Sequence, residues 1–329
     1  MFVPVLLFLV GLVLLIKGGD WFVDGATGIA KRFRIPEFLI GATVVSIGTT
    51  LPEVMVSVTG ALSGQGGMAY GNAIGSVICN TALIAAVTVT AAPPNIDKKT
   101  FRSPVIFFFA AAIFYSLIAY FAGGFSRICG IVLLSIFAVY MVHTVHKAVK
   151  TSSQMAQIEN EKKEDDGKKT DKRGVQLEVL LLVVGAVLVA VGARLLVKNG
   201  TLIAEEIGVP DSVIALTFVA LGTSLPELVT AITALVKGHG AISLGNIVGA
   251  NLFNLVLVAG LSVTLSPFSL PASKTVFGVN ASLAVDIPVM LFVMLLLTMP
   301  AFIRGKFSRW QGITLLTVYF AFLAFQFFV

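Results

Sequence analysis

Long apolar stretches alternate with short polar segments along the whole chain. Most of these stretches have about 20 residues or more, the length that a helix needs to cross a hydrocarbon core of ~30 Å. The first stretch has neither a basic segment before it nor a small-residue cleavage site, so we expect a spanning helix there and not a signal peptide. The pattern predicts an all-α integral membrane protein with ten transmembrane helices, near 2–29, 36–63, 67–92, 103–122, 126–147, 176–204, 210–236, 241–265, 280–302 and 309–328.

One polar segment is much longer than the others. Residues 159–173 are a mixed run of acidic and basic side chains that cannot bury a core. We therefore expect a first five-helix repeat over 1–147, a charged cytoplasmic linker over 148–174 and a second five-helix repeat over 175–329.

The two halves resemble each other at a constant spacing. The segment Gly48–Glu53, with the sequence GTTLPE, returns 174 positions later as Gly222–Glu227, with the sequence GTSLPE, and the same spacing relates Asn80 to Asn254. Roughly a third of the positions between 35 and 80 are identical to their counterparts. Because each half has an odd number of spans, the second copy must enter the membrane inverted. Inverted repeats with interrupted helices are typical of secondary transporters.

Basic residues gather in alternate loops. Cytoplasmic loops of membrane proteins carry an excess of Lys and Arg. We therefore expect a multi-pass protein of the cell (plasma or inner) membrane, with both termini outside and the linker in the cytoplasm. The residues on the expected cytoplasmic side are Lys31, Arg32, Arg34, Lys98, Lys99, Arg102, Lys237, Arg304, Lys306 and Arg309, together with the linker.

The composition excludes several classes of protein. The chain is 57% hydrophobic and 12% charged, whereas soluble domains carry about 25% charged residues. The net charge of +6 comes largely from the loops and indicates no nucleic-acid partner. Cys79 and Cys129 lie in apolar stretches and suggest neither a disulfide framework nor a metal cluster. The sequence contains no nucleotide-binding loop or His-Glu-x-x-His motif, so we expect neither an enzyme nor a cofactor.

Two glutamates at membrane depth are the main candidates for function, because an intramembrane carboxylate is costly. Pro52 precedes Glu53 and breaks the helical hydrogen-bond ladder, which frees backbone carbonyls. A hard cation is a suitable partner for such oxygens. Thr49 and Thr50 lie four and three residues before Glu53 and so share its helix face. The second copy supplies Thr223, Ser224 and Glu227, and together the two copies predict one cation site.

The following helix of each half adds amides and small residues. Asn72, Ser76 and Asn80 recur every four residues, and Gly71 and Gly75 form a small-xxx-small pair. A packing face with interhelical amide bonds is the alternative reading, and it is strong for the glycines. Asn80 and its counterpart Asn254 lie deeper in their apolar stretches and can offer a carbonyl oxygen. Asp286, just before Ile287-Pro288, is interpreted as an acid at a helix start.

These paired segments resemble the two alpha repeats of the sodium/calcium exchanger family, within the cation/calcium antiporter superfamily. The linker has no room for the calcium-sensing domains of animal members, so the chain resembles the prokaryotic type without a regulatory domain. The resemblance implies that Glu53 and Glu227 coordinate calcium and sodium alternately. It also implies ligand hydroxyls at Thr49, Thr50, Thr223, Ser224 and Ser76, and backbone carbonyls at Ser46 and Ala220.

Two departures from the family pattern affect the expected ions. Asn254 stands where some relatives, including potassium-dependent exchangers, carry Asp, and Ala250 replaces a Ser. The expected site then has two formal negative charges. We expect an antiporter that exchanges sodium for calcium, with proton/calcium antiport as the alternative, and a channel or scaffold is disfavoured. The expected partners are calcium, sodium and the lipid bilayer, and no obligate protein partner is inferred.

Overall fold

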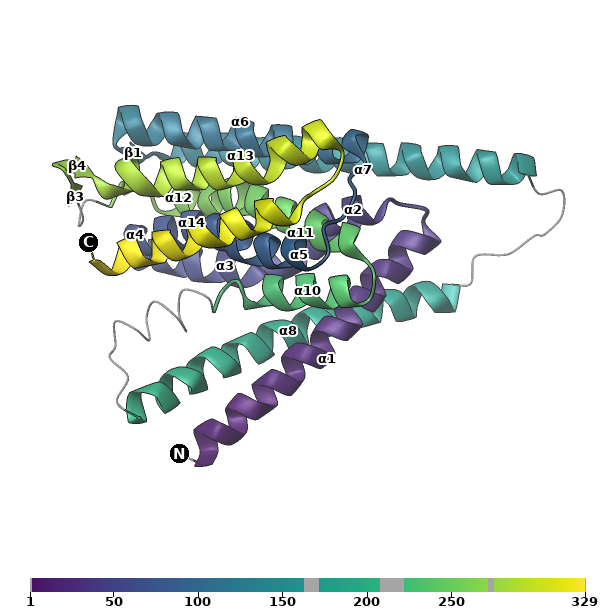
Figure 1. The fold of residues 1–329 in the computed structure, drawn as a ribbon, viewed down its shortest axis with the longest axis horizontal. Coiled ribbons are helices and arrows are strands. Elements are labelled where there is room, and N and C mark those ends of the chain that lie inside the picture. The colour runs from purple at the N-terminus through teal and green to yellow at the C-terminus, as the bar shows by residue number, and fades with distance from the viewer. Residues whose placement is uncertain (1, 163–171, 208–221, 272–274, 329) are drawn as a thin grey trace.

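The computed structural model describes residues 2–162, 172–207, 222–271 and 275–328, and these residues are almost entirely helical (Figure 1). The middle of the charged linker and the first part of the span expected at 210–236, with Ala220, lie outside the described residues. The elements of the first half are α1 (Phe2–Arg32), α2 (Glu37–Ile40), the π-helical turn η1 (Gly41–Val45), α3 (Ser46–Leu62), α4 (Gly66–Cys79), the π-helical turn η2 (Asn80–Ala85), α5 (Ala86–Ala91), α6 (Lys98–Ala122), β1 (Gly124–Phe125) and α7 (Arg127–Lys162).

The second half follows a similar order. Its elements are α8 (Lys172–Glu206), α10 (Leu225–Val236), α11 (Gly240–Phe253), the π-helical turn η4 (Asn254–Val258), α12 (Ala259–Leu265), β2 (Phe268–Ser269), β3 (Thr275–Val276), β4 (Val279–Asn280), the π-helical turn η5 (Ser282–Asp286), α13 (Ile287–Arg304) and α14 (Arg309–Phe328). The strands form only two short antiparallel pairs, β1 with β2 and β3 with β4.

The described helices bear out an all-α, multi-pass membrane protein. Eight continuous helical segments among them are long and apolar enough to cross a membrane, and α10 is a shorter apolar helix. The eight segments are Phe2–Arg32, Glu37–Leu62, Gly66–Ala91, Lys98–Ala122, Arg127–Gln154, Gly174–Ile203, Gly240–Leu265 and Ser282–Arg304. They coincide with spans expected from the hydropathy pattern, and α14 covers the last one.

The boundaries of the elements repeat at the spacing found in the sequence. The bounds of α4, Gly66–Cys79, correspond to those of α11, Gly240–Phe253, with 174 positions between them. The π-helical turns η2 and η4 begin at the equivalent residues Asn80 and Asn254. π-Helical turns are rare and are frequent at functional sites. Equivalent sequences therefore form equivalent interrupted helices in the two halves.

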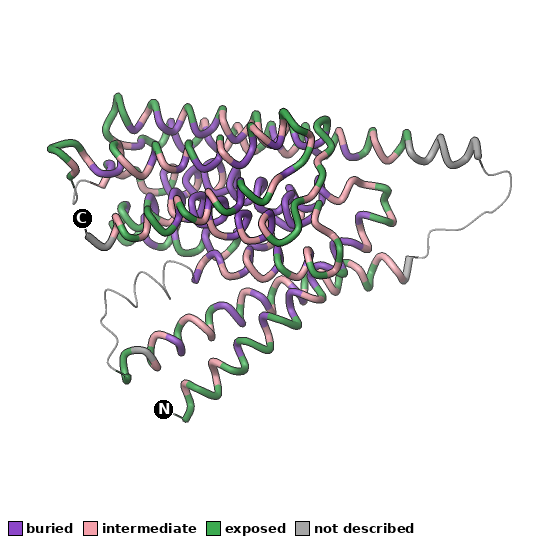
Figure 2. Tube along the Cα trace, in the orientation of Figure 1, coloured by how far each residue is buried: buried purple, intermediate pink, exposed green. Residues whose placement is uncertain are grey.

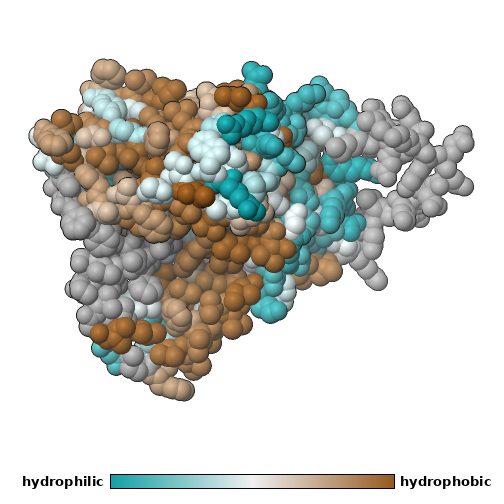
Figure 3. Space-filling model, in the orientation of Figure 1, coloured by the Kyte–Doolittle hydropathy of each residue, from teal (hydrophilic) through white to brown (hydrophobic). Residues whose placement is uncertain are grey.

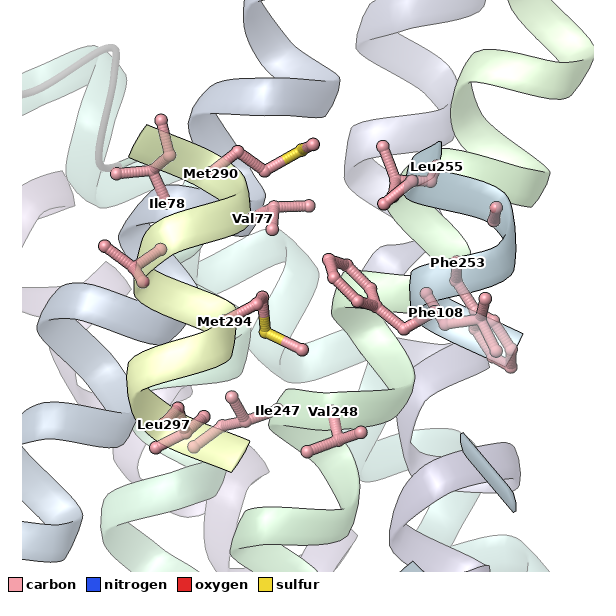
Figure 4. Packing of buried hydrophobic residues seen from close by; sticks show 14 of the residues in the cluster. Val77, Ile78, Phe108, Ile247, Val248, Phe253, Leu255, Met290, Met294 and Leu297 are labelled. Atoms are coloured by element: carbon pink, nitrogen blue, oxygen red, sulfur yellow. The ribbon is translucent and has the colours of Figure 1, made fainter. Parts of the chain in front are cut away.

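The α4–α5 and α11–α12 segments lie at the centre of the molecule. In the most apolar 18-residue stretch of each segment, 78% and 83% of the residues are buried, compared with 22% for the corresponding stretch of α1 (Figure 2). Their apolar side chains pack against α13 and α6, where Ile247 and Val248 of α11 face Leu297 and Met294 of α13 (Figure 4). The two segments that carry the asparagines are therefore held in a fixed frame.

The two ends of the bundle differ. Both chain termini lie at one end, and the end of α7 and the start of α8 lie at the other (Figure 1). Hydrophilic residues gather at this second end on the face drawn in Figure 3. Ion pairs tie its elements together: Arg32 of α1 pairs with Glu178 of α8 at 2.8 Å, and Lys237, just after α10, pairs with Asp24 of α1 at 2.8 Å.

Helices α1 and α8 pack closely along their length, side by side against the rest of the bundle (Figure 1). Gly185 of α8 lies against the backbone of α1, and a Cβ atom added there would come within 2.4 Å of the Phe22 nitrogen. Small residues allow such close approach of spanning helices. The position therefore requires glycine for packing.

We predict that Gly185→Ala destabilises the protein by about 1–3 kcal/mol, because the added methyl group forces the two helix backbones apart. Gly71→Ala in α4 is the matched control. A Cβ atom at Gly71 meets no atom within 4 Å, so the control should lose no stability and gain up to about 1 kcal/mol of helix propensity. Thermal unfolding in detergent measures both variants. Equal stability of the Gly185→Ala variant and the unchanged protein would contradict the close contact.

Candidate functional site

The two copies of the Pro-Glu motif occupy different positions relative to their helices. Pro52 lies inside α3, with Glu53 directly after it. In the second copy, residues 222–224 form a turn, Pro226 is at the start of α10 and Glu227 is in its first turn. The amino-terminal end of a helix carries a partial positive charge that favours a carboxylate. The backbone therefore compensates part of the charge of Glu227.

The side chains of the motif are buried without hydrogen-bond partners. Glu53 and Glu227 are both 0% exposed, and none of their four carboxylate oxygens has a partner. The same holds for the amides of Asn80 and Asn254 and for the hydroxyls of Thr50 and Ser224. Burial of a polar group without a partner costs several kcal/mol, and burial of a charge costs more. This set of oxygens therefore has the chemistry of a cation site.

The fold brings the two halves together at this set. Helix α3 contacts α10 and η4, and α10 also contacts η2. Glu53 and Glu227 lie close enough for their charges to interact, and the buried Cys79 thiol, which accepts a hydrogen bond from the Tyr319 hydroxyl at 3.8 Å, lies near both of them. Sequence reasoning placed Cys79 only in an apolar stretch. Cys79 directly precedes Asn80, and this position was the signal that could have placed the thiol near the site.

Two reciprocal hydrogen bonds cross between the halves. The Thr49 hydroxyl donates to Oδ1 of Asn246 at 3.1 Å, and the equivalent Thr223 hydroxyl donates to Oδ1 of Asn72 at 3.1 Å. The amide of Asn72 then donates to the backbone oxygen of Glu53 at 3.2 Å. Asn72 and Asn246 therefore orient the threonines of the opposite half. Their hydroxyl oxygens keep lone pairs for a cation, because the threonines donate in both bonds.

The remaining candidates differ in their surroundings. Ser46 is fully buried, and its hydroxyl donates to the backbone oxygens of Gly41 at 2.8 Å and Asn246 at 3.0 Å. Its hydroxyl is thus occupied, and the role of its backbone carbonyl as a ligand stays a prediction. Ser76 is 4% exposed and lines a cavity. Ala220 lies outside the described residues.

A cavity of about 520 Å³ leads toward the site from the end of the molecule that carries the termini. It follows α4 from the exposed Gly71 past Asn72 to the buried Ser76, and it also touches Thr223. The carboxylates of Glu53 and Glu227 do not line this cavity. The cavity therefore reaches two candidate neutral ligands, Ser76 and Thr223, without reaching the carboxylates.

Equivalent glycines of the two halves have opposite surroundings. A Cβ atom added at Gly75 in α4 meets no atom within 4 Å. A Cβ atom added at its counterpart Gly249 in α11 would come within 2.3 Å of the Ser46 hydroxyl, and one at Gly245 within 2.3 Å of the Phe38 oxygen. The face of α4 is thus open to the cavity, whereas the equivalent face of α11 is closed against α2, η1 and α3.

The donor set is made of oxygens. Among the described residues, no group of three or more His, Cys, Asp or Glu side chains is arranged so that it could by itself hold a metal ion. Two carboxylates with amide and hydroxyl oxygens suit hard cations such as calcium and sodium better than soft transition metals. The arrangement can therefore bind a hard cation.

Known proteins match this chain over nearly its whole length. The family model of sodium/calcium exchanger proteins matches residues 3–145 and 177–328. An uncharacterized membrane protein of Methanocaldococcus jannaschii is 36% identical over 312 residues, which are 95% of this chain and 94% of that protein. The sodium/calcium exchanger MaX1 of Methanosarcina acetivorans is 30% identical over 362 residues, covering 98% of each chain. A solved structure of the sodium-calcium exchanger NCX_Mj, soaked with both ions, has a TM-score of 0.81 and 32% identity, again over 98% of each chain.

We predict that calcium stabilises the folded protein through the two glutamates. A ligand at 100 times its dissociation constant adds about 2.7 kcal/mol, so thermal unfolding in detergent should shift upward with calcium. Glu53→Gln and Glu227→Gln should each remove this shift. Without calcium, both variants should be at least as stable as the unchanged protein, because each removes one of two neighbouring buried charges. A calcium-dependent shift that survives in either variant would place the binding site elsewhere.

Proposed function

The chain belongs to the sodium/calcium exchanger protein family, and we propose that it is a secondary active antiporter that exchanges sodium for calcium across the membrane. The observation that carries this proposal is the set of buried oxygens without partners, contributed by both halves of the chain. A site shared by two halves can change its accessibility when the halves move relative to each other.

The charges of the site favour exchange of unlike cations. The two carboxylates of Glu53 and Glu227 balance one calcium ion, and its removal leaves two neighbouring negative charges in a buried site. That state is costly, so sodium must replace calcium before the site can reorient. Because the same oxygens serve both ions, binding of one opposes binding of the other. Thr49, Thr50, Thr223, Ser224, Ser76, Asn80 and Asn254 supply the neutral oxygens, with the backbone carbonyls of Ser46 and Ala220.

We propose ten spanning helices in two inverted five-helix repeats, with alternating access at a site near the midplane. The matching bounds of α4 and α11 and of η2 and η4 support this arrangement. The open face at Gly75 and the closed face at Gly249 fit a state with access from one side. In the opposite state, an inverted repeat would exchange these two environments, so that α11 faces an open cavity and α4 is closed.

We further propose that the protein lies in the cell membrane with both termini outside and the linker inside. Both termini lie at one end of the molecule, and basic residues are concentrated at the other end. This distribution supports the orientation. The cavity along α4 then opens to the outside. An inward sodium gradient would drive calcium out of the cell through this site.

The proton/calcium alternative is less well supported. Protonation of two carboxylates requires no array of threonine, serine and asparagine oxygens around them, whereas sodium binding does. The family and the two named exchangers also favour sodium.

We predict that an imposed sodium gradient drives calcium flux in vesicles that contain the purified protein, and that a proton gradient of equal size does not. Glu53→Gln and Glu227→Gln should each abolish the flux, because each removes a charged ligand from a dehydrated site. Cys129→Ser is the control. Cys129 is a buried thiol that lies far from the motif in the sequence, so this variant should retain transport. Proton-driven flux that is independent of sodium would establish the alternative function.

We also predict that transport needs no potassium. With two carboxylates, one calcium ion already neutralises the site, and an added potassium ion would be an uncompensated buried charge. Calcium uptake should be unchanged when choline replaces potassium, and Asn254→Asp, which adds a third carboxyl group, should alter the cation dependence. A strict potassium requirement would refute the two-charge site. An Asn254→Asp variant with unaltered cation dependence would make Asn254 a packing residue.

A further inference from the structure

Asp286 is a charged residue inside a membrane span that the candidate site does not use. The sequence suggested an acid at the start of a helix, and Asp286 is the residue directly before the first residue of α13. The π-helical turn η5 covers Ser282–Asp286 and runs directly into α13, so Asp286 lies a full turn inside the span Ser282–Arg304. Its side chain caps no backbone N–H group. Charged residues within spans commonly face a water-filled route and mark an ion pathway.

Asp286 lines the cavity that leads to the site. Among the described residues that line this cavity, it is the only one with a charged side chain. Ser76 and Thr223, which are candidate ion ligands, line the same cavity. Asp286 is half-buried, with apolar neighbours such as Phe322 and Leu323 in the cavity wall. A carboxylate between apolar walls produces a focused field along such a route.

The surroundings of Asp286 hold its carboxylate at the cavity wall. The amide nitrogen of Gln326 in α14 donates to its Oδ1 at 2.9 Å, and Gln326 lines the cavity as well. The turn that precedes Asp286 is held from the other side, because the Tyr120 hydroxyl donates to the backbone oxygen of Leu283 at 2.5 Å. π-Helical turns also begin at Asn80 and Asn254 in the candidate site. In the same way, the π-helical turn η5 places the Asp286 carboxylate on the route to that site.

We propose that Asp286 is a capture residue for calcium on the entry route. It attracts the divalent cation into the cavity and passes it inward to Ser76, Thr223 and the paired glutamates. This inference rests on the proposed antiport function. The role of Asp286 is to raise the rate of association from the cavity side, and it is not a ligand of the transported ion in its buried site.

Three consequences distinguish capture from a structural role. Loss of the charge lowers the association rate, so the KM for calcium at the cavity face rises while kcat is unchanged. The electrostatic energy of a divalent ion is twice that of a monovalent ion. The fold-change in the KM for calcium should therefore be about the square of the fold-change in the KM for sodium. Steering weakens with ionic strength, so the effect should shrink in high salt.

The experiment measures calcium exchange in right-side-out and inverted vesicles, with calcium varied on one face at a time. Asp286→Asn keeps an oxygen for the Gln326 amide and removes the charge. At low ionic strength it should raise the KM for calcium at the cavity face about threefold or more, with the KM at the opposite face and kcat unchanged. Glu205→Gln is the matched control, because Glu205 is an exposed acid at the end of α8 that does not line the cavity. It should leave both KM values unchanged.

A second carboxylate position separates charge from shape. A Cβ atom at Gly71 meets no atom within 4 Å, and Gly71 lines the mouth of the cavity. Gly71→Asp should lower the KM for calcium at the cavity face in the otherwise unchanged protein, and it should restore a low KM to the Asp286→Asn variant. If Asp286→Asn does not fold, Gly71→Asp alone still tests the field in the cavity.

The outcomes separate this inference from the proposed function. Absence of sodium-driven calcium flux in the unchanged protein would overturn the function itself. If the unchanged protein shows normal sodium-driven flux but the Asp286→Asn variant has an unchanged KM, or a KM raised equally at both faces, only the capture role is overturned. A KM raised at the cavity face but not lowered by Gly71→Asp would assign Asp286 a structural role and would also overturn the proposal.

Discussion

Two buried carboxylates without hydrogen-bond partners are the constraint on which this structure depends. Glu53 and Glu227 have no exposed surface, and they lie close enough for their charges to interact. Such a pair is costly at membrane depth unless cations or protons neutralise its charges. The apolar side chains of α6, α11 and α13 pack into one core around the central helices. The affinity of the site for cations follows from this constraint.

Prolines and π-helical turns lie in each half where the site needs oxygens. Pro52 lies inside α3, Pro226 starts α10, and π-helical turns begin at Asn80 and Asn254. The reciprocal bonds of Thr49 with Asn246 and of Thr223 with Asn72 then couple the two halves at the same place. A movement of one half relative to the other must alter these bonds, which links the geometry of the site to its accessibility.

Much of this arrangement could be predicted from the sequence, because the two halves repeat at one spacing and the apolar stretches have the length of a membrane span. The hydropathy pattern predicted the described spans, and the repeated Pro-Glu motif predicted that Glu53 and Glu227 belong together. The pattern did not reveal the position of Cys79 near both glutamates, the π-helical turns or the place of Asp286 in the wall of the cavity. Each of these depends on how distant elements pack, and hydropathy carries no information about that. Likewise, the opposite surroundings of Gly75 and Gly249 arise from identical residues, and no local sequence could distinguish them.

The most direct measurement of the central claim is the position of the bound ion. Crystals grown with calcium, or soaked with it, should show an anomalous difference peak between the carboxylates of Glu53 and Glu227. We expect oxygen ligands from both halves at about 2.3–2.6 Å from this peak, and we expect sodium in excess to displace it. A calcium peak coordinated by residues of only one half, or one that lies outside the buried site, would contradict the shared cation site.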